Sequence, residues 1–262
     1  MTARTGRLVA DDIRVAFRPA QRNAAPAIAL DGLSLDVGGG EIVALIGPNG
    51  CGKSTFLRVA AGLLRPERGR VTLDGVGVTA PDPRIGLVFQ EPRLLPWRSV
   101  ADNVTYPLEL AGWSRERRAA RLAELLPVVG LEAAAALRPV QLSGGMRQRA
   151  AIARALVLAP DVLLLDEPFS ALDALTRERF NLDLLGLQER TGTSILIVTH
   201  SIPEAILVAD RVVVMTPRPG RVAAEVRITA PRPRSLALLD EALTSRAAAE
   251  IRAHLELGEP VG

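Results

Sequence analysis

Residues 47–55 read GPNGCGKST and contain both the only lysine and the only cysteine of the chain, Lys53 and Cys51. All the remaining basic residues, out of 32 in this 262-residue chain, are arginines. An apolar run, EIVALI (41–46), precedes the stretch as expected for a buried strand, and a helical pattern follows it from 53 to about 64. Strand, glycine-rich loop and helix in this order, with the spacing Gly-x4-Gly-Lys-Ser, predict a phosphate-binding loop.

The chemistry of phosphate binding accounts for the residue types in this loop. Backbone N–H groups are expected to surround a β-phosphate, and the positive end of the following helix points at the same anion. Lys53 is expected to reach between the β- and γ-phosphates, where a compact ammonium fits and a forked guanidinium is too wide. Ser54 offers a hydroxyl to Mg²⁺. The nucleotide-binding residues predicted here are Gly47, Pro48, Asn49, Gly50, Cys51, Gly52, Lys53, Ser54 and Thr55.

Length and composition limit the class of protein. With 48% hydrophobic residues, the chain can bury a large core. Its 32 basic and 29 acidic residues include no basic block, so we expect no nucleic-acid partner. One cysteine excludes an intrachain disulfide, the N-terminus lacks the apolar stretch of a secretory signal, and no apolar run reaches the roughly 18 residues that span a bilayer. These features predict a soluble chain.

Short apolar runs alternate with helical segments, which predicts an α/β fold around a largely parallel sheet. Residues 100–159 are different, because alanine, leucine, arginine and glutamate dominate them with helical periodicity. We therefore expect a helical lobe inserted between two strands, and a terminal helix at 235–256. The other expected strands are 7–17, 28–37, 84–89, 161–166, 193–199 and 210–215, with an edge strand at 222–228.

Two adjacent carboxylates follow one of these apolar runs, in the segment DVLLLDEP (161–168). The strand is expected to place Asp166 beside the phosphate loop, where its carboxylate can hold Mg²⁺ directly or through water. Glu167 comes next and can polarise an attacking water. A solvated strand end is the alternative reading, but it is commoner for one acid than for two after four apolar residues.

A second anion-binding helix N-terminus is predicted in QLSGGMRQR (141–149), where a serine and two glycines open a helix. One chain would then carry two phosphate sites, one of which needs a nucleotide from elsewhere. The combination of LSGGMRQR with LLLDEP strongly resembles the ATP-binding cassette (ABC) ATPases. A simple helix cap is the alternative for SGG alone.

The resemblance covers most of the chain and implies its architecture. We expect a phosphate-loop NTPase fold of the ABC ATPase type, with a mainly parallel core sheet, an N-terminal antiparallel β-subdomain and an inserted helical subdomain. The implied boundaries form a single ATP-binding domain over 7–262. Within it, 7–90 and 160–230 form the core with the β-subdomain, 91–159 the helical subdomain and 231–262 a helical tail.

The resemblance also implies the roles of individual residues. Phe17 matches the aromatic residue on which adenine stacks, and Gln90, after GLVF, matches the glutamine that senses Mg²⁺ and the γ-phosphate. The loop SALD (170–173) matches the one that crosses to the partner, and His200 matches the histidine that contacts the γ-phosphate. The implied catalytic residues are Glu167, His200, Lys53 and Gln90, the metal-binding residues Ser54, Gln90 and Asp166, and the further nucleotide-binding residues Ser143, Gly144, Gly145, Gln148 and Asp173.

In that family two cassettes sandwich ATP head to tail and drive transmembrane subunits. The implied partners are therefore a second ATP-binding subunit, here expected to be another copy of the chain, a permease received around residues 91–110, and indirectly an extracytoplasmic solute-binding protein. The segments FQEPRLLPW (89–97), ALDALTR (171–177) and RPGRV with PRPR (231–234) are similar to importer ATPases of the nitrate, sulfonate and taurine group. The implied location is the cytoplasmic face of the cell membrane.

The chain departs from the family pattern at one position. The family histidine is usually followed by an acid, whereas this chain has Ser201, so we expect a tuned rate of ATP hydrolysis and not an inactive enzyme.

Two other functions stay open. An exporter subunit remains an alternative because the nucleotide chemistry is identical, and so does a non-transport ABC ATPase. Ribosomal relatives usually carry two cassettes and DNA-repair relatives a long coiled coil, and this sequence shows neither.

Overall fold

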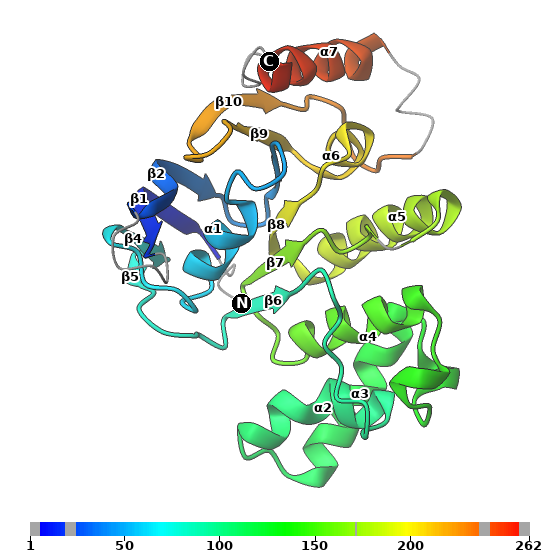
Figure 1. Cartoon of the computed structure of the whole chain (residues 1–262). Coiled ribbons are helices and arrows are strands. Elements are labelled where there is room, and N and C mark those ends of the chain that lie inside the picture. The colour runs from blue at the N-terminus through cyan, green and yellow to red at the C-terminus, as the bar shows by residue number, and fades with distance from the viewer. Residues whose placement is uncertain (1–5, 19–24, 171, 236–241, 257–262) are drawn as a thin grey trace.

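The computed structural model of the chain describes residues 6–18, 25–170, 172–235 and 242–256. Its centre is a six-stranded sheet in the order β10-β9-β3-β8-β7-β6 (Figure 1), in which only β10 runs antiparallel to its neighbour. The expected parallel sheet and its edge strand are confirmed, and the structure adds that the edge strand runs antiparallel. The strands are β3 (Ile42–Ile46), β6 (Ile85–Val88), β7 (Val162–Asp166), β8 (Ser194–Val198), β9 (Arg211–Met215) and β10 (Val222–Arg227).

A second, antiparallel sheet lies beside the first, in the order β2-β1-β4-β5. Its first two strands were expected, whereas β4 and β5 were missed. The first three residues of β4 are exposed, so the alternating pattern starts only at Val71, and β5 has two residues. The strands are β1 (Leu8–Phe17), β2 (Ala27–Val37), β4 (Arg68–Leu73) and β5 (Val76–Gly77).

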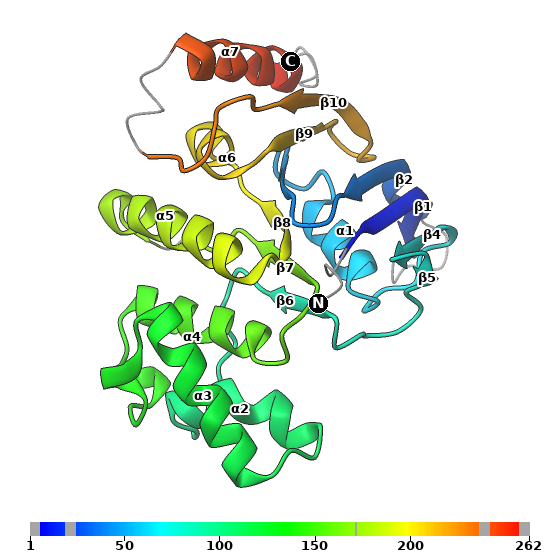
Figure 2. The same ribbon diagram turned by 180° about the vertical axis from the view of Figure 1, so that it is seen from behind.

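Helices cover both faces of the core sheet, and three of them form a separate lobe (Figures 1 and 2). The predicted helix at 53–64 ends earlier, at Ala60, and Gly62 then turns the chain with φ 70°. Two helices, α5 and α6, had not been assigned, and of the expected terminal helix the residues 236–241 lie outside the described part. The helices are α1 (Lys53–Ala60), α2 (Val100–Leu110), α3 (Arg115–Val129), α4 (Gly144–Leu156), α5 (Ala174–Thr191), α6 (Ile202–Val208) and α7 (Ala242–Glu256), with short 3-10 turns at Glu132–Ala134 and Pro139–Gln141.

Short polar side chains set where several of these helices begin. Ser99, Ser114 and Ser143 precede α2, α3 and α4, and each hydroxyl accepts a hydrogen bond from the backbone N–H three residues later. Asp173 does the same for α5. Such caps satisfy N–H groups that a helix leaves without partners.

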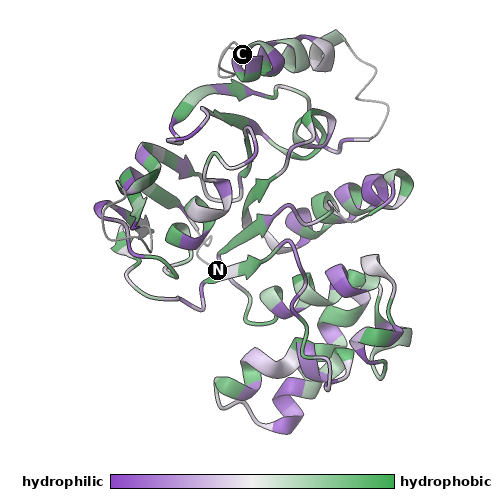
Figure 3. Ribbon diagram, viewed as in Figure 1, coloured by the Kyte–Doolittle hydropathy of each residue, from purple (hydrophilic) through white to green (hydrophobic). Residues whose placement is uncertain are grey.

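The central strand β3 shows how the two faces are filled. Ile42, Ala44 and Ile46 point into a core shared with α4, α5, α6 and the helical lobe. Val43 and Leu45 point to the other face, against α1 and the antiparallel sheet. Because both faces are covered, every residue of this strand is buried, and Figure 3 shows the core strands as almost uniformly hydrophobic. Within the described residues, no helix is both long enough and apolar enough to cross a membrane.

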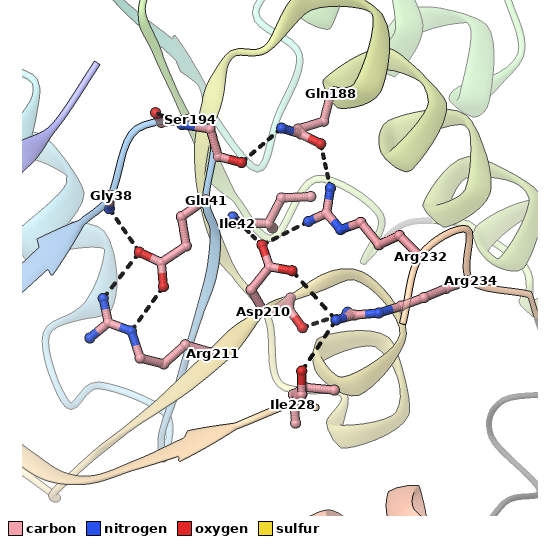
Figure 4. A network of polar contacts seen from close by, with 12 residues as sticks. Gly38, Glu41, Ile42, Gln188, Ser194, Asp210, Arg211, Ile228, Arg232 and Arg234 are labelled. Atoms are coloured by element: carbon pink, nitrogen blue, oxygen red, sulfur yellow. Dashed lines mark hydrogen bonds and ion pairs between the residues drawn. The ribbon is translucent and has the colours of Figure 1, made fainter. Parts of the chain in front are cut away.

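A polar network ties the segment after β10 to the core (Figure 4). The Asp210 carboxylate accepts hydrogen bonds from the backbone N–H of Ile42 at 2.9 Å, from Arg232 at 2.7 Å and from Arg234 at 3.4 Å. The Arg234 side chain is only 1% exposed, and it also donates to the carbonyl of Ala209 beyond α6. One carboxylate therefore holds together the start of β3, the end of α6 and the chain that leads to α7.

We predict that Asp210→Ala lowers the free energy of unfolding by about 2 to 4 kcal/mol, since it leaves a buried guanidinium without its counter-charge. Asp183→Ala is the matched control, because Asp183 also pairs with an arginine but its side chain is 50% exposed. The control should lose less than about 1 kcal/mol. Urea unfolding of both variants checks this, and equal losses would contradict the role of the network.

Candidate active site

The loop between β3 and α1 has the backbone geometry of an anion cradle. Gly50 and Gly52 have φ of 76° and 111°, in the region where residues with side chains are strained. A Cβ at Gly52 would also lie 2.7 Å from the Leu30 side chain, whereas a Cβ at Gly50 would meet nothing within 4 Å. Glycine at 50 is therefore required by conformation alone, and glycine at 52 by conformation and space.

The turn between β9 and β10 supports this loop from behind, which the sequence did not predict. Gly220 donates its N–H to the carbonyl of Ala29 at 2.9 Å. A Cβ at Gly220 would lie 2.1 Å from the backbone oxygen of Cys51. The glycine of the RPGRV segment thus allows close packing against the phosphate loop.

Lys53 is enclosed by its own loop. Its side chain is almost buried, and Nζ donates to the carbonyls of Gly47 at 2.8 Å and Pro48 at 3.0 Å. The thiol of Cys51 lies 3.9 Å from the same Nζ, but it belongs to the apolar core, and burial raises its pKa. Cys51 can therefore bind an anion only through its backbone N–H. The positive charge of the loop is on the Lys53 ammonium, which lies in a narrow space.

Ser54 and Asp166 come together as predicted from their separate motifs. Ser54 Oγ donates to Asp166 Oδ1 at 3.0 Å, joining the start of α1 to the end of β7. Burial is the main cause that raises the pKa of Asp166, and the Ser54 hydrogen bond acts against it. One hydroxyl and one carboxylate suit Mg²⁺, which in nucleotide sites takes few protein ligands and completes its shell with phosphate oxygens and waters. In the described part of the chain no cluster of three or more acidic, histidine or cysteine side chains could hold a metal alone.

Glu167 lies at the meeting point of three elements. Its backbone has φ of 43°, a conformation that costs roughly 1–3 kcal/mol for a non-glycine residue and often marks a functional site. Its N–H donates to the carbonyl of Val198, so the bend is fixed by β8. Oε2 lies 3.4 Å from Gln90 Nε2 and 3.4 Å from His200 Nδ1. The structure thus brings three of the predicted catalytic residues around one carboxylate oxygen.

The turn that carries His200 is built by its neighbours. Thr199 Oγ1 accepts from the N–H of Ser201 at 3.0 Å and donates to the carboxylate of Glu204. Ser201 Oγ caps α6 by accepting from the N–H of Glu204. Ser201 therefore supplies the kind of acceptor that an acid would supply there, which explains how the turn tolerates the departure from the family pattern. Glu204 is buried, and this burial raises its pKa.

The serine-glycine segment forms the exposed start of α4. Ser143 is exposed, and Gly144 and Gly145 are partly exposed beside it. Figure 1 shows α4 in the helical lobe, apart from α1 and the phosphate loop. Gln148, which was predicted to contact nucleotide, is only 3% exposed in the single chain. Its Nε2 has no hydrogen-bond partner among the described residues.

Two other predicted residues lie on the surface. Phe17 ends β1 with 42% of its surface exposed, so an aromatic ring is available for stacking. Asp173 caps α5 by accepting from the N–H of Thr176, and this hydrogen bond lowers its pKa. Of the predicted SALD loop, Ala171 lies outside the described residues.

Comparison with known proteins places this geometry in a family. The model of the ABC transporter family matches residues 30–170. The chain is 52% identical over 200 residues to the aliphatic sulfonates import ATP-binding protein SsuB 2 of Burkholderia lata, covering 76% of this chain and 72% of that protein. It is 50% identical over 196 residues to the taurine import ATP-binding protein TauB of Rhizobium johnstonii, covering 75% of each.

A solved structure is similar in its whole length. It is the dimeric post-hydrolysis state of an ATP-binding cassette bound to ADP and phosphate, and it matches with a TM-score of 0.75 and 32% identity. The match covers 86% of this chain and 100% of the solved chain.

We predict that Lys53→Arg lowers nucleotide turnover by at least about a hundredfold, because the wide guanidinium cannot enter the space around the Gly47 and Pro48 carbonyls. The control is Arg65→Lys, the reverse exchange at an exposed position after α1, which should keep turnover within about twofold. Phosphate release by the purified variants measures both rates. Near-normal turnover of Lys53→Arg would show that charge alone is required.

Proposed function

The chain belongs to the ABC transporter family, and from this premise we propose that it powers solute import by hydrolysing ATP held between two copies of itself. As a family member it is an ATP-binding and ATP-hydrolysing protein. The observation that carries the proposal is the meeting of Gln90, Glu167 and His200 at one oxygen, beside the Ser54–Asp166 pair and the Lys53 loop.

The residues of one chain divide the chemistry in this proposal. Lys53 and the backbone N–H groups of its loop bind the phosphates of ATP, and the ring of Phe17 stacks on adenine. Ser54, Asp166 and Gln90 would hold Mg²⁺, which neutralises charge that develops on the phosphates. Glu167 Oε2 accepts a hydrogen bond from the water that attacks the γ-phosphate. As a general base it polarises this water and takes its proton as the bond to phosphorus forms. His200, 3.4 Å from the same oxygen, contacts the γ-phosphate.

A second copy completes each site. Ser143, Gly144 and Gly145 present free N–H groups at the start of α4, but no contact joins them to the phosphate loop of their own chain in the described residues. An exposed helix N-terminus is suited to an anion from outside. In a head-to-tail dimer it faces the γ-phosphate bound by the partner, with Asp173 at the crossing loop.

Import is the direction that the relatives support, since two of them are named as import proteins for aliphatic sulfonates and taurine. We propose an organic sulfonate as the solute and a permease as the membrane partner, with a solute-binding protein outside the membrane. The chain would lie against the cytoplasmic face of the membrane. The permease contact would involve residues 91–110, where the Trp97 side chain is 69% exposed.

Growth tests this proposal directly. In the organism that carries this chain, its deletion should abolish growth on taurine or an alkanesulfonate as sole sulfur source, but not on sulfate. A copy of the wild-type gene should restore growth, and a Glu167→Gln copy should not, because removing the base lowers hydrolysis by about a hundredfold or more. Glu67→Gln is the control, since it makes the same change at a half-exposed glutamate and should restore growth.

Purified Glu167→Gln protein separates the parts of the proposal. It should form a dimer only when ATP is present, because the binding contacts remain while hydrolysis is slow. The function would be contradicted if the deletion strain still grew on sulfonates and the purified variant also formed no dimer with ATP. If the variant formed a dimer with ATP but the deletion strain grew normally, only the proposed solute class would be contradicted.

A further inference from the structure

The segment that follows Gln90 is bonded to the helical lobe by one half-buried arginine. Arg154, near the end of α4, donates from its two terminal nitrogens to the carbonyls of Pro92 and Arg93, both at 2.9 Å. On the other side, Val88 ends β6 and pairs with Leu165 of β7. Only residues 89–91 therefore separate the sheet from the part of the chain that Arg154 holds.

A second helix of the lobe fixes the next residues. Asn103 of α2 is fully buried, and its amide accepts from the N–H of Leu95 at 2.7 Å. It also donates to the carbonyls of Leu95, Arg98 and Ser99. The chain from 92 to 99 is thus bonded to α4 at one end and to α2 at the other, so it should move with the lobe.

The short joint is itself tightly folded. Arg93 has φ of 46°, and its guanidinium lies over the ring of Phe89 at 4.4 Å. Gln90 lies between Phe89 and Arg93 in the chain, with Nε2 3.4 Å from Glu167 Oε2. The lobe-bound residue Arg93 is therefore only three residues from the amide that faces Glu167.

The partners of Arg154 are unusual for a half-buried cation. Its side chain bonds to two neutral carbonyls, and no carboxylate pairs with it in the described ranges of the chain. Burial lowers its pKa, because the guanidinium is partly removed from water. The two carbonyls therefore supply hydrogen-bond partners that replace water.

The two ends of α4 have different surroundings. Ser143 caps its start, where the proposed dimer places the partner's ATP. Arg154 lies eleven residues further on, which is about 16 Å along a helix with a rise of ~1.5 Å per residue. A helix transmits a displacement over such a length because its backbone hydrogen bonds hold it as one rigid element.

We propose that Arg154 is a positioning residue for hydrolysis, which makes α4 and the segment 92–99 move as one body. Contact of the partner's ATP with the start of α4 then sets the distance between Gln90 and Glu167 in this chain's own site. The proposal rests on the dimeric ATP sandwich of the proposed function. It predicts that loss of the two bonds uncouples the nucleotide sites while each phosphate loop still binds ATP.

The chain offers a closely matched control in Arg121 of α3. Its guanidinium donates to two successive carbonyls, Leu156 at 3.4 Å and Val157 at 3.0 Å, at the same end of α4. Within the described residues its hydrogen bonds go to Glu124, Leu156 and Val157, and none reaches residues 89–99. Arg121→Met and Arg154→Met thus remove the same kind of bond from the same helix end, but only the second touches the joint.

The experiment compares Arg154→Met, Arg154→Lys and Arg121→Met with wild type. Equilibrium binding of ATP should stay within about twofold for all four proteins, since no phosphate-loop contact changes. For Arg154→Met we expect kcat to fall at least about tenfold, because a small displacement of a catalytic group is costly. Its Hill coefficient for ATP should fall toward one, with Arg154→Lys between it and wild type. Amide exchange of the 89–99 peptide should be faster in Arg154→Met than in Arg121→Met.

Two results would overturn the proposal. One is an Arg154→Met enzyme whose kcat and Hill coefficient stay within about twofold of wild type, and the other is an equal loss in Arg121→Met. Amide exchange needs no turnover, so it reports the mobility of residues 89–99 even if wild type hydrolyses no ATP. A wild type without ATP hydrolysis would count against the proposed function. Equal exchange in Arg154→Met and Arg121→Met would count against the role of Arg154 alone.

Discussion

Parallel pairing of β6, β7 and β8 is the constraint on which the site depends. Strands that run in the same direction end at the same edge of a sheet, so the residues that follow them meet there. Gln90 follows β6, Glu167 follows β7 and His200 follows β8, and their side chains converge although 110 residues separate the first from the last. The Glu167 N–H bond to Val198 extends this pairing beyond the strands and fixes the strained backbone bend at Glu167.

The sequence predicted the elements that obey a local rule. Buried parallel strands are short apolar runs, and the phosphate loop has a fixed spacing, so the core sheet, its antiparallel edge and Ser54 beside Asp166 were all predictable. What was missed has no local signal. β4 starts with exposed residues, and the need for glycine at 220 comes from the backbone of Cys51, far away in the chain. Gln148 was expected at the nucleotide from its motif, and its burial in the single chain depends on the surrounding packing, which the motif does not describe.

The division into two lobes gives the proposed function its mechanical basis. The core carries the groups proposed to bind the phosphates and to activate the attacking water, and the helical lobe carries the exposed start of α4 and the surface proposed for the permease (Figure 1). Residues 89–91 and 157–161 join the lobe to sheet strands, and the first of these joints contains Gln90. In the proposed function, a movement of the lobe would therefore change the surroundings of Glu167, and hydrolysis would in turn alter the lobe.

The central claim is that each ATP lies between Lys53 of one chain and Ser143 of the other, and mixing two defective chains tests it most directly. Within a Glu167→Gln background, Lys53→Ala should bind no ATP and Ser143→Arg should bind ATP without closing, so each alone remains a monomer. In the mixed dimer, the first chain supplies an intact Ser143 and the second an intact Lys53, which restores one complete site of two. Size-exclusion chromatography with labelled ATP should then show a dimer that carries one nucleotide. A mixture that stays monomeric would contradict the shared site.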